Sequence, residues 1–149
     1  MRHALSVLLV ICAFCFVGCK GKKPVRTGPP KTDVEFARDV FQRMSQGDIS
    51  AGELIDFDHL SIAGIDISGQ YRNLTTDSSR ENFRSSFIKG YSNSFKSSGG
   101  NIDALTNWRE QSKDAGQTIV AADAPNGNTI LITVSHADGQ QKVSVLALK

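Results

Sequence analysis

Residues 118–148, TIVAADAPNGNTILITVSHADGQQKVSVLAL, decide the fold. Apolar side chains that share one face recur there with a period of two, at Ile130, Ile132 and Val134 and again at Val143 and Val145. This period is typical of strands that bury one face. The dipeptides Asn126-Gly127 and Asp138-Gly139 separate the runs, and such residues accept the positive φ angles of hairpin turns. The stretch therefore predicts consecutive antiparallel strands.

One further predicted strand precedes this stretch. The C-terminal half is therefore expected to form a four-stranded antiparallel meander. The predicted strands cover residues 105–112, 118–124, 129–136 and 142–148. Such a sheet needs a cover for its apolar face. The candidate is a helix over residues 79–97, opened by a capping box of Ser78 with Glu81. Its aromatic stripe recurs every four residues, at Phe83, Phe87, Tyr91 and Phe95.

Two shorter helices are expected before it. Thr32 and Glu35 have capping-box spacing and open a predicted helix over residues 33–46, which Gly47 ends. A second capping box, Ser50 with Glu53, opens a short helix that ends near His59. Glycines interrupt residues 60–74, which are expected to be a loop with room for one short strand. The sequence thus predicts one α+β domain over residues 33–149, with its N-terminal helices packed on the meander.

The charge distribution separates the domain from the segment before it. Residues 33–149 contain eleven basic and fifteen acidic side chains, so the net charge of the domain is −4. A nucleic-acid-binding surface normally needs an excess of basic residues, so nucleic-acid binding is not expected. Residues 20–32 contain five basic residues and no acid, in a stretch rich in Pro and Gly. This composition predicts a flexible tether that can contact a membrane surface.

The three cysteines, Cys12, Cys15 and Cys19, all precede the domain, which leaves no disulfide or thiolate chemistry within it. Residues 4–17 form an apolar run that is shorter than the ~20 residues of a transmembrane helix, and residues 1–18 read as a signal peptide. The run ends in Phe16-Val17-Gly18-Cys19, which resembles the bacterial lipobox. The resemblance implies that Cys19 is lipidated and begins a tether over residues 19–32.

The lipobox resemblance places the domain in the cell envelope, held by acyl chains on a lipid membrane. Several acyl chains give a lasting anchor that a single chain cannot give. Lys20 follows Cys19 where an inner-membrane retention signal has aspartate, so delivery to an outer membrane is favoured in a cell that has one. The alternatives to a lipidated Cys19 are that residues 1–18 are an ordinary secretory signal or an uncleaved anchor.

Helices followed by an antiparallel sheet resemble the nuclear transport factor 2-like superfamily, over residues 33–149; a cystatin-like arrangement, one helix on a meander, is the alternative. The superfamily includes polyketide cyclases, dehydratases, isomerases and noncatalytic lipoproteins. The resemblance implies a cone whose open end holds a small apolar ligand. It also implies a homodimer paired through the sheets, as in many members.

The polar residues to examine at such a cone are few. Asp56, Asp58 or His59 would be the base of a lyase or isomerase, and Tyr71 its hydrogen-bond donor. The residues that would contact a ligand are Tyr71, Trp108 and Arg109. On the plainer interpretation, Asp56, Asp58 and His59 are solvated groups at the end of a helix. The rings of Tyr71 and Trp108 are then part of the core.

No metal or other cofactor is expected, because the domain has no cysteine, no paired-histidine motif and no glycine-rich phosphate loop. Two functions follow from these observations. The first is a noncatalytic module that binds a small apolar ligand or another envelope protein. The alternative is a small lyase or isomerase of the polyketide-cyclase kind, which requires the candidate side chains to converge in one enclosed pocket.

Overall fold

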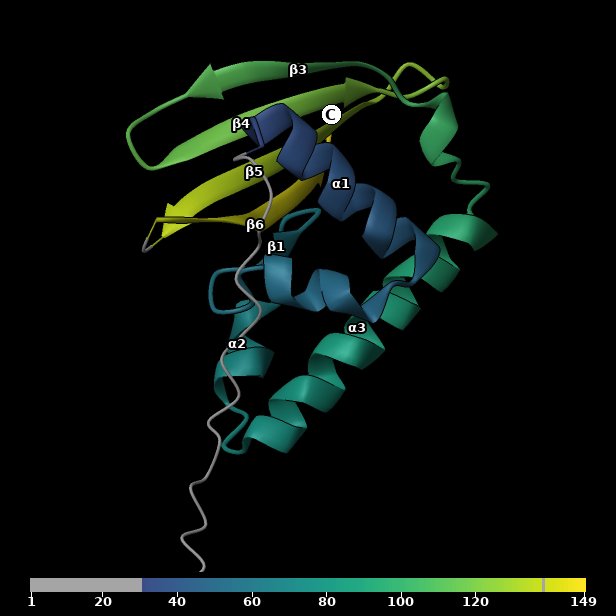
Figure 1. The fold of residues 1–149 in the computed structure, drawn as a ribbon. Coiled ribbons are helices and arrows are strands. Elements are labelled where there is room, and N and C mark those ends of the chain that lie inside the picture. Colours follow the sequence, from purple (N-terminus) through teal and green to yellow (C-terminus); the bar gives the residue numbers. More distant parts are fainter. Residues whose placement is uncertain (1–30, 138) are drawn as a thin grey trace, which may run out of the picture.

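The computed structural model describes residues 31–137 and 139–149, so the predicted signal peptide, Cys19 and most of the predicted tether lie outside the described residues. Helices and one sheet make up the described chain (Figure 1), and the predicted α+β class is confirmed. Within these residues, no helix combines the length and apolar character that a bilayer crossing requires.

The sheet has six strands in the order β2-β1-β6-β5-β4-β3. Four of them pair with their chain neighbours in antiparallel fashion: β3 (Thr106–Lys113), β4 (Gln117–Asp123), β5 (Thr129–Ala137) and β6 (Gln140–Leu148). The short strands β1 (Ser61–Ile62) and β2 (Ile65–Asp66) extend the edge beyond β6.

Strand β1 runs parallel to β6, with Ser61 opposite Val145. The expectation of a four-stranded antiparallel sheet is therefore corrected to a six-stranded mixed sheet. Strands of two residues are too short to show a period of two, which is why the sequence pattern does not reveal them.

Helix α1 (Asp33–Gln46) begins and ends as predicted. The Thr32 hydroxyl accepts a hydrogen bond from the Glu35 amide at 3.2 Å, and the Thr32 amide donates to the Glu35 carboxylate at 2.9 Å. Gly47 ends the helix in the left-handed region, at a φ of 82°. The apolar face of α1 contacts β3, β4, β5 and β6 and includes the buried residues Phe36, Val40, Phe41 and Met44.

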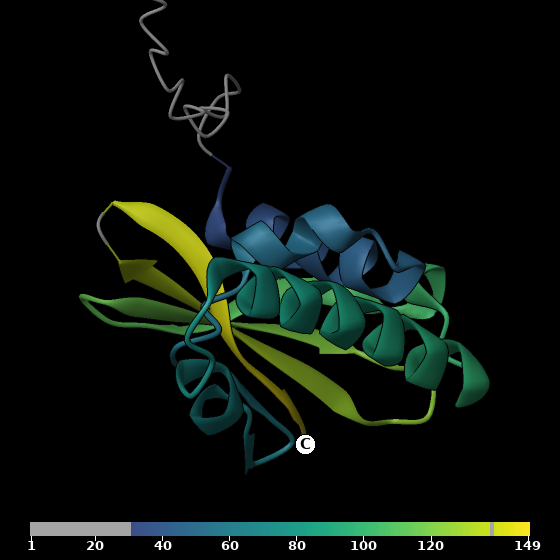
Figure 2. The same cartoon turned by 90° about the horizontal axis from the view of Figure 1, so that it is seen from below.

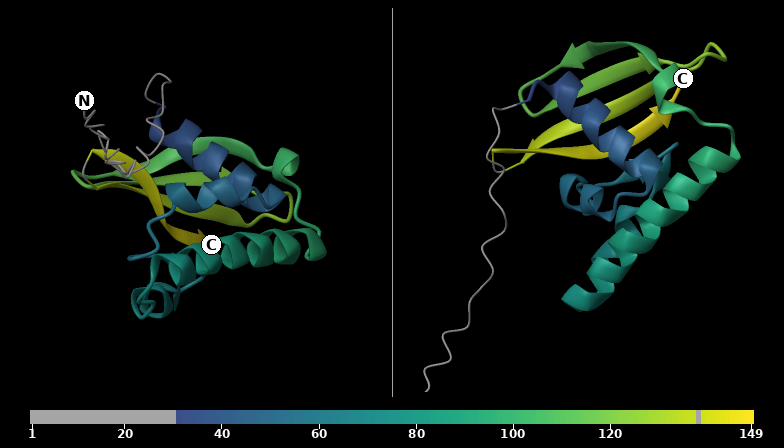
Figure 3. Two further views of the ribbon diagram at one scale, coloured as in Figure 1. Left: turned by 60° about the horizontal axis from the view of Figure 1, so that its bottom comes forward. Right: turned by 45° about the vertical axis from the view of Figure 1, so that its right-hand side comes forward.

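The aromatic helix is α3 (Asp77–Ser97), and its main contacts are with α1 and with the 3₁₀ helix η1 (Ile49–Leu54). The expectation that this helix covers the sheet is therefore wrong, because α1 already occupies the sheet face. Figures 2 and 3 show α1 across the strands and α3 beside it. Phe83 and Phe87 pack on Phe57, whereas Tyr91 and Phe95 pack on Phe41.

Two predicted helix starts are corrected. Helix α3 is capped by Thr76, whose hydroxyl accepts from the Ser79 amide at 3.1 Å, and not by Ser78 with Glu81. Asp48 caps η1 by accepting from the Ser50 amide at 3.0 Å. Several hydroxyl and carboxylate side chains near each start can act as caps. Only the path of the incoming chain decides among them. The other helices are α2 (Ser68–Arg72) and η2 (Ile102–Ala104).

Candidate functional site

A cavity of about 490 Å³ lies at the end of the sheet, where the C-terminal half of α3 stands beside the strands. It exists because α3 packs on α1 and leaves the space beside the sheet end unfilled. Its walls are predominantly apolar and come from α1, α3, the β4–β5 turn and the end of β6. The apolar residues that define it are Phe41, Tyr91, Phe95, Leu105, Ile130 and Leu146.

Tyr91 is the ionisable side chain among the described residues that line this cavity. Burial raises the pKa of the Tyr91 hydroxyl, which therefore stays protonated at neutral pH. Its ring lies edge-on to Phe41, with centroids 6.1 Å apart, and stacks on Phe95 at 6.3 Å. None of the described residues forms a hydrogen bond with the hydroxyl, so this group can bond to a ligand.

Gly100 shapes the same cavity through its lack of a side chain. A Cβ placed there would come within 2.6 Å of the Phe95 ring and of the Phe95 carbonyl oxygen. The Gly100 amide donates to that carbonyl at 2.8 Å, which folds the chain back after α3. Glycine at this position therefore lets the chain turn tightly around Phe95.

The predicted catalytic residues lie around a different hollow. Asp56 is largely buried, and its carboxylate bonds to His59 Nδ1 at 2.9 Å. The His59 side chain is 73% exposed, and Asp58 is exposed as well. Tyr71 is buried, with its hydroxyl accepting from Arg84 Nε at 3.0 Å. The structure brings Asp56, Asp58 and Tyr71 to one hollow, away from the cavity beside α3.

Trp108 and Arg109 line neither of these two spaces. They are neighbours on β3 and have different partners. The Trp108 ring packs on Phe41 at 6.2 Å, and the Arg109 guanidinium bonds to Asp123 at 3.0 Å. Trp108 nevertheless packs on Phe41, which is a wall residue of the cavity.

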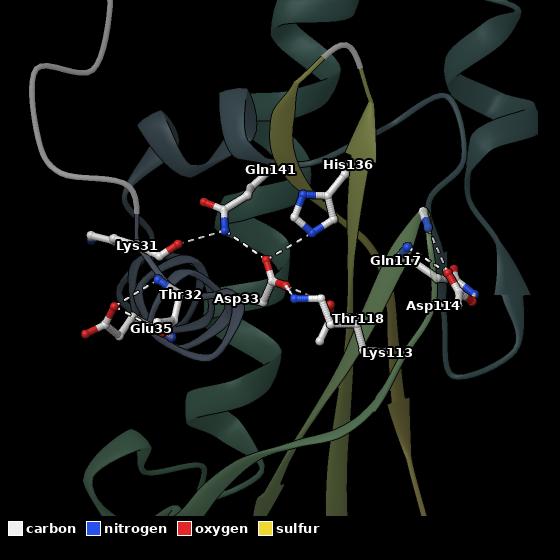
Figure 4. A network of polar contacts seen from close by, with 11 residues as sticks. Lys31, Thr32, Asp33, Glu35, Lys113, Asp114, Gln117, Thr118, His136 and Gln141 are labelled. Atoms are coloured by element: carbon white, nitrogen blue, oxygen red, sulfur yellow. Dashed lines mark hydrogen bonds and ion pairs between the residues drawn. The ribbon is translucent and has the colours of Figure 1, made fainter.

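A polar cluster around Asp33 was not predicted. Asp33 opens α1 with a buried carboxylate, which accepts from Thr118 Oγ1 at 2.7 Å and from Gln141 Nε2 at 2.8 Å (Figure 4). His136 Nε2 lies 3.1 Å from the same carboxylate, and Lys113 Nζ lies 3.4 Å away. The cluster joins the start of α1 to β3, β4, β5 and β6.

These contacts set the ionisation of Asp33. Burial by itself would raise the pKa of this carboxyl, but hydrogen bonds from Thr118 and Gln141, together with the charge of His136, outweigh it and lower the pKa. Thr118 and Gln141 lie 85 and 108 positions further along the chain than Asp33, so no local sequence motif indicates these contacts. Sequence patterning could mark Asp33 only as a helix-opening acid.

We compared the chain with models of protein families, with curated proteins and with solved structures, and none of the three comparisons gives a match.

Proposed function

We propose that this protein is a lipid-anchored envelope lipoprotein whose domain is a noncatalytic binding module for a small apolar ligand. The observation that carries the proposal is the cavity beside α3, with about 490 Å³ of space and mainly apolar walls. Small-molecule sites have this size and this character, with few polar groups to orient the ligand. Tyr91 and the side chains of Ser98, Asn101 and Asn128 supply such polar groups.

The ligand of this cavity is uncharged. Among its described lining residues, none carries a charge at neutral pH, because the Tyr91 hydroxyl stays protonated. A charged ligand would lose its hydration without gaining an ionic partner, which costs several kcal/mol. An alcohol, ketone or amide with an apolar body therefore suits the walls better than a carboxylate does.

We also propose the nuclear transport factor 2-like arrangement for residues 33–149. Helix α1 covers the sheet while α3 encloses a cavity at one sheet end, which is what a cone requires. The cystatin-like alternative has one helix on the sheet and provides no second helix for that wall.

The alternative function, a small lyase or isomerase, has less support. Its candidate base and donor residues lie outside the apolar cavity, and His59 is largely exposed. Asp58, the other candidate base beside Asp56, is exposed as well.

The ligand proposal is tested with Trp108, the single tryptophan of the chain, as reporter. Titration with decanol should change Trp108 fluorescence, and decanoate should bind at least about tenfold more weakly because its charge would be buried. Ala104→Phe fills the cavity from η2 and should abolish the decanol response. The matched control is Ala115→Phe in the exposed β3–β4 turn. An unchanged response in Ala104→Phe would contradict the proposed site.

The anchor is tested separately by membrane fractionation. Cys19→Ala should move the protein from the membrane fraction to the soluble fraction, because the acyl chains that hold it would be lost. A variant that stays in the membrane fraction would show that another element holds the protein.

A further inference from the structure

A second hollow, of about 720 Å³, lies between η1, the segment after it, the first half of α3 and the start of β6. Its described lining differs from that of the apolar cavity because it carries charges of both signs. The cations are Arg80, Arg84 and Lys142, and the carboxylates are Glu53, Asp56 and Asp58.

Arg80 and Arg84 lie one turn apart on α3, and both are held against the Tyr71 ring. Their guanidinium carbons lie 5.5 and 5.8 Å from the ring centroid. Arg80 Nε donates to the Leu74 carbonyl at 3.1 Å, and Arg84 Nε donates to the Tyr71 hydroxyl at 3.0 Å. Each arginine thus uses its Nε to fix its position, which leaves its two terminal nitrogens to act as donors.

Those terminal nitrogens are poorly neutralised by the described residues. Arg84 Nη1 lies 3.8 Å from Glu81, an exposed side chain, and Arg80 forms no ion pair within residues 31–137 and 139–149. Two like charges one helical turn apart repel each other. An oxyanion placed between them removes this repulsion, and the planar arginine fork matches the geometry of phosphate oxygens.

The acidic residues of the hollow further restrict the class of ligand that it can bind. Asp56 is bonded to His59, whereas the carboxylates of Glu53 and Asp58 are exposed on the same lining. A plain anion would face these carboxylates as well as the arginines. A group with a phosphate and an ammonium can satisfy both sets of charges.

We propose that this hollow binds a zwitterionic phosphate–ammonium group, of the kind found in phosphoethanolamine and in the headgroup of phosphatidylethanolamine. In this arrangement Arg80, Arg84 and Lys142 hold the phosphate, and Glu53 and Asp58 face the ammonium.

The position of the hollow favours a lipid as the source. Gln141 lines the hollow and donates to the Lys31 carbonyl at 3.0 Å, so the chain enters the domain beside it. If Cys19 is anchored, as proposed above, the segment up to Lys31 reaches roughly 40 Å at most. The hollow then stays within reach of the membrane headgroups.

The first test is calorimetric titration of the full-length mature protein in a neutral detergent. Phosphoethanolamine should bind about tenfold more tightly than inorganic phosphate or ethanolamine alone, because only the whole group uses both sets of charges. Lys142→Gln should weaken this binding by about tenfold, since it removes an ammonium that has no hydrogen bond or ion pair among the described residues. Lys89→Gln, on α3 outside the hollow, is the matched control.

Arg80→Lys with Arg84→Lys keeps both charges and removes the fork, so binding should fall as well, with the unfolding temperature showing that the protein remains folded. Equal affinity for inorganic phosphate and phosphoethanolamine, or unchanged binding in Lys142→Gln, would overturn the proposal.

The second test distinguishes the two sources. Vesicles of phosphatidylglycerol, with and without phosphatidylethanolamine, are mixed with the Cys19→Ala protein and with the same protein carrying Lys142→Gln. A difference between the proteins that arises only with phosphatidylethanolamine supports the headgroup. Binding of soluble phosphoethanolamine without such a difference supports a free ligand and the same chemistry. Ala104→Phe, which fills the apolar cavity, should leave both results unchanged, so the two proposals fail independently.

Discussion

Ala63 has a backbone conformation that L-residues rarely adopt, with a φ of 49° in the turn between β1 and β2. Gly64 follows it at 81°, so both central residues of this two-residue turn have positive φ. The Ala63 amide donates to the Leu146 carbonyl at 2.7 Å, which holds the turn against β6. An alanine in this region costs roughly 1 kcal/mol compared with glycine.

Ala63→Gly should therefore raise the free energy of unfolding by about 0.5 kcal/mol, since the removed strain is partly offset by the greater freedom of glycine in the unfolded chain. Urea denaturation measures the change. Gly64→Ala places a side chain at a φ of 81° with no neighbour within 4 Å of its Cβ, and it should destabilise the protein through the backbone alone. A loss of stability in Ala63→Gly would contradict this account.

Asp33 gives the second prediction at this scale. Asp33→Asn should lower the free energy of unfolding by about 2 kcal/mol at neutral pH, because a buried acceptor of charge-assisted hydrogen bonds is lost. The folded-state pKa of Asp33 lies below its ordinary value of 3.8. The carboxylate therefore stabilises the fold fully above that value, and its contribution disappears as pH falls through the lower folded pKa.

The difference between the wild type and Asp33→Asn should accordingly shrink between pH 5 and pH 2, a range of about three units around the ordinary pKa. Urea denaturation across this range measures it. Glu110→Gln, an exposed carboxylate on β3 whose side chain has no hydrogen bond or ion pair among the described residues, is a control for general acid effects. A difference that stays constant with pH would mean that Asp33 acts through packing rather than through its charge.

At the scale of elements, the contact between α3 and the rest of the molecule depends on one face of that helix. Ile88 is fully buried on this face, between the two pairs of aromatic residues that contact Phe57 and Phe41. Ser92 extends the contact by donating to the Ser45 carbonyl at the end of α1, at 2.8 Å.

Ile88→Ala should lower the free energy of unfolding by about 3 kcal/mol, because it removes buried methyl groups and leaves a cavity between helices. Lys89→Ala, its exposed neighbour on the same helix, should change stability by less than about 0.5 kcal/mol. Thermal and urea denaturation measure both variants. Equal effects of the two substitutions would place α3 outside the cooperative core.

At the scale of the whole molecule, the central strands of the sheet have more neighbouring structure than the edge formed by β1 and β2. Strands β4, β5 and β6 have hydrogen-bonded neighbours on both sides and lie under α1, whereas β1 and β2 contribute two residues each at one edge. Backbone amides in well-covered central strands open only with large free energies.

Hydrogen exchange should therefore be slowest in β4, β5 and β6 and fastest in β1 and β2, with β3 between them as the opposite edge. Mass spectrometry of peptides covering residues 117–123, 129–137 and 61–66 measures the order. Comparable protection of 61–66 and 129–137 would contradict the assignment of β1 and β2 as a weak edge.

The sequence alone determined the elements whose signals are local. The helix from Asp33 to Gln46, with its Thr32–Glu35 cap, and strand β5, with Ile130, Ile132 and Val134 buried at alternate positions, carry their signals in adjacent positions. The aromatic stripe of α3 was equally visible, because side chains four residues apart share a helix face.

Only the tertiary structure decided which helix covers the sheet, that β1 joins β6 in parallel, and where the two hollows lie. Tyr91, Leu105 and Ile130 look like ordinary core residues in the sequence, and only the placement of α3 beside the sheet turns them into cavity walls. Asp33 accepts hydrogen bonds from Thr118 and Gln141, which are separated from it by most of the domain's sequence. Contacts of this kind leave no periodic trace, because they depend on how complete elements pack rather than on spacing within any one of them.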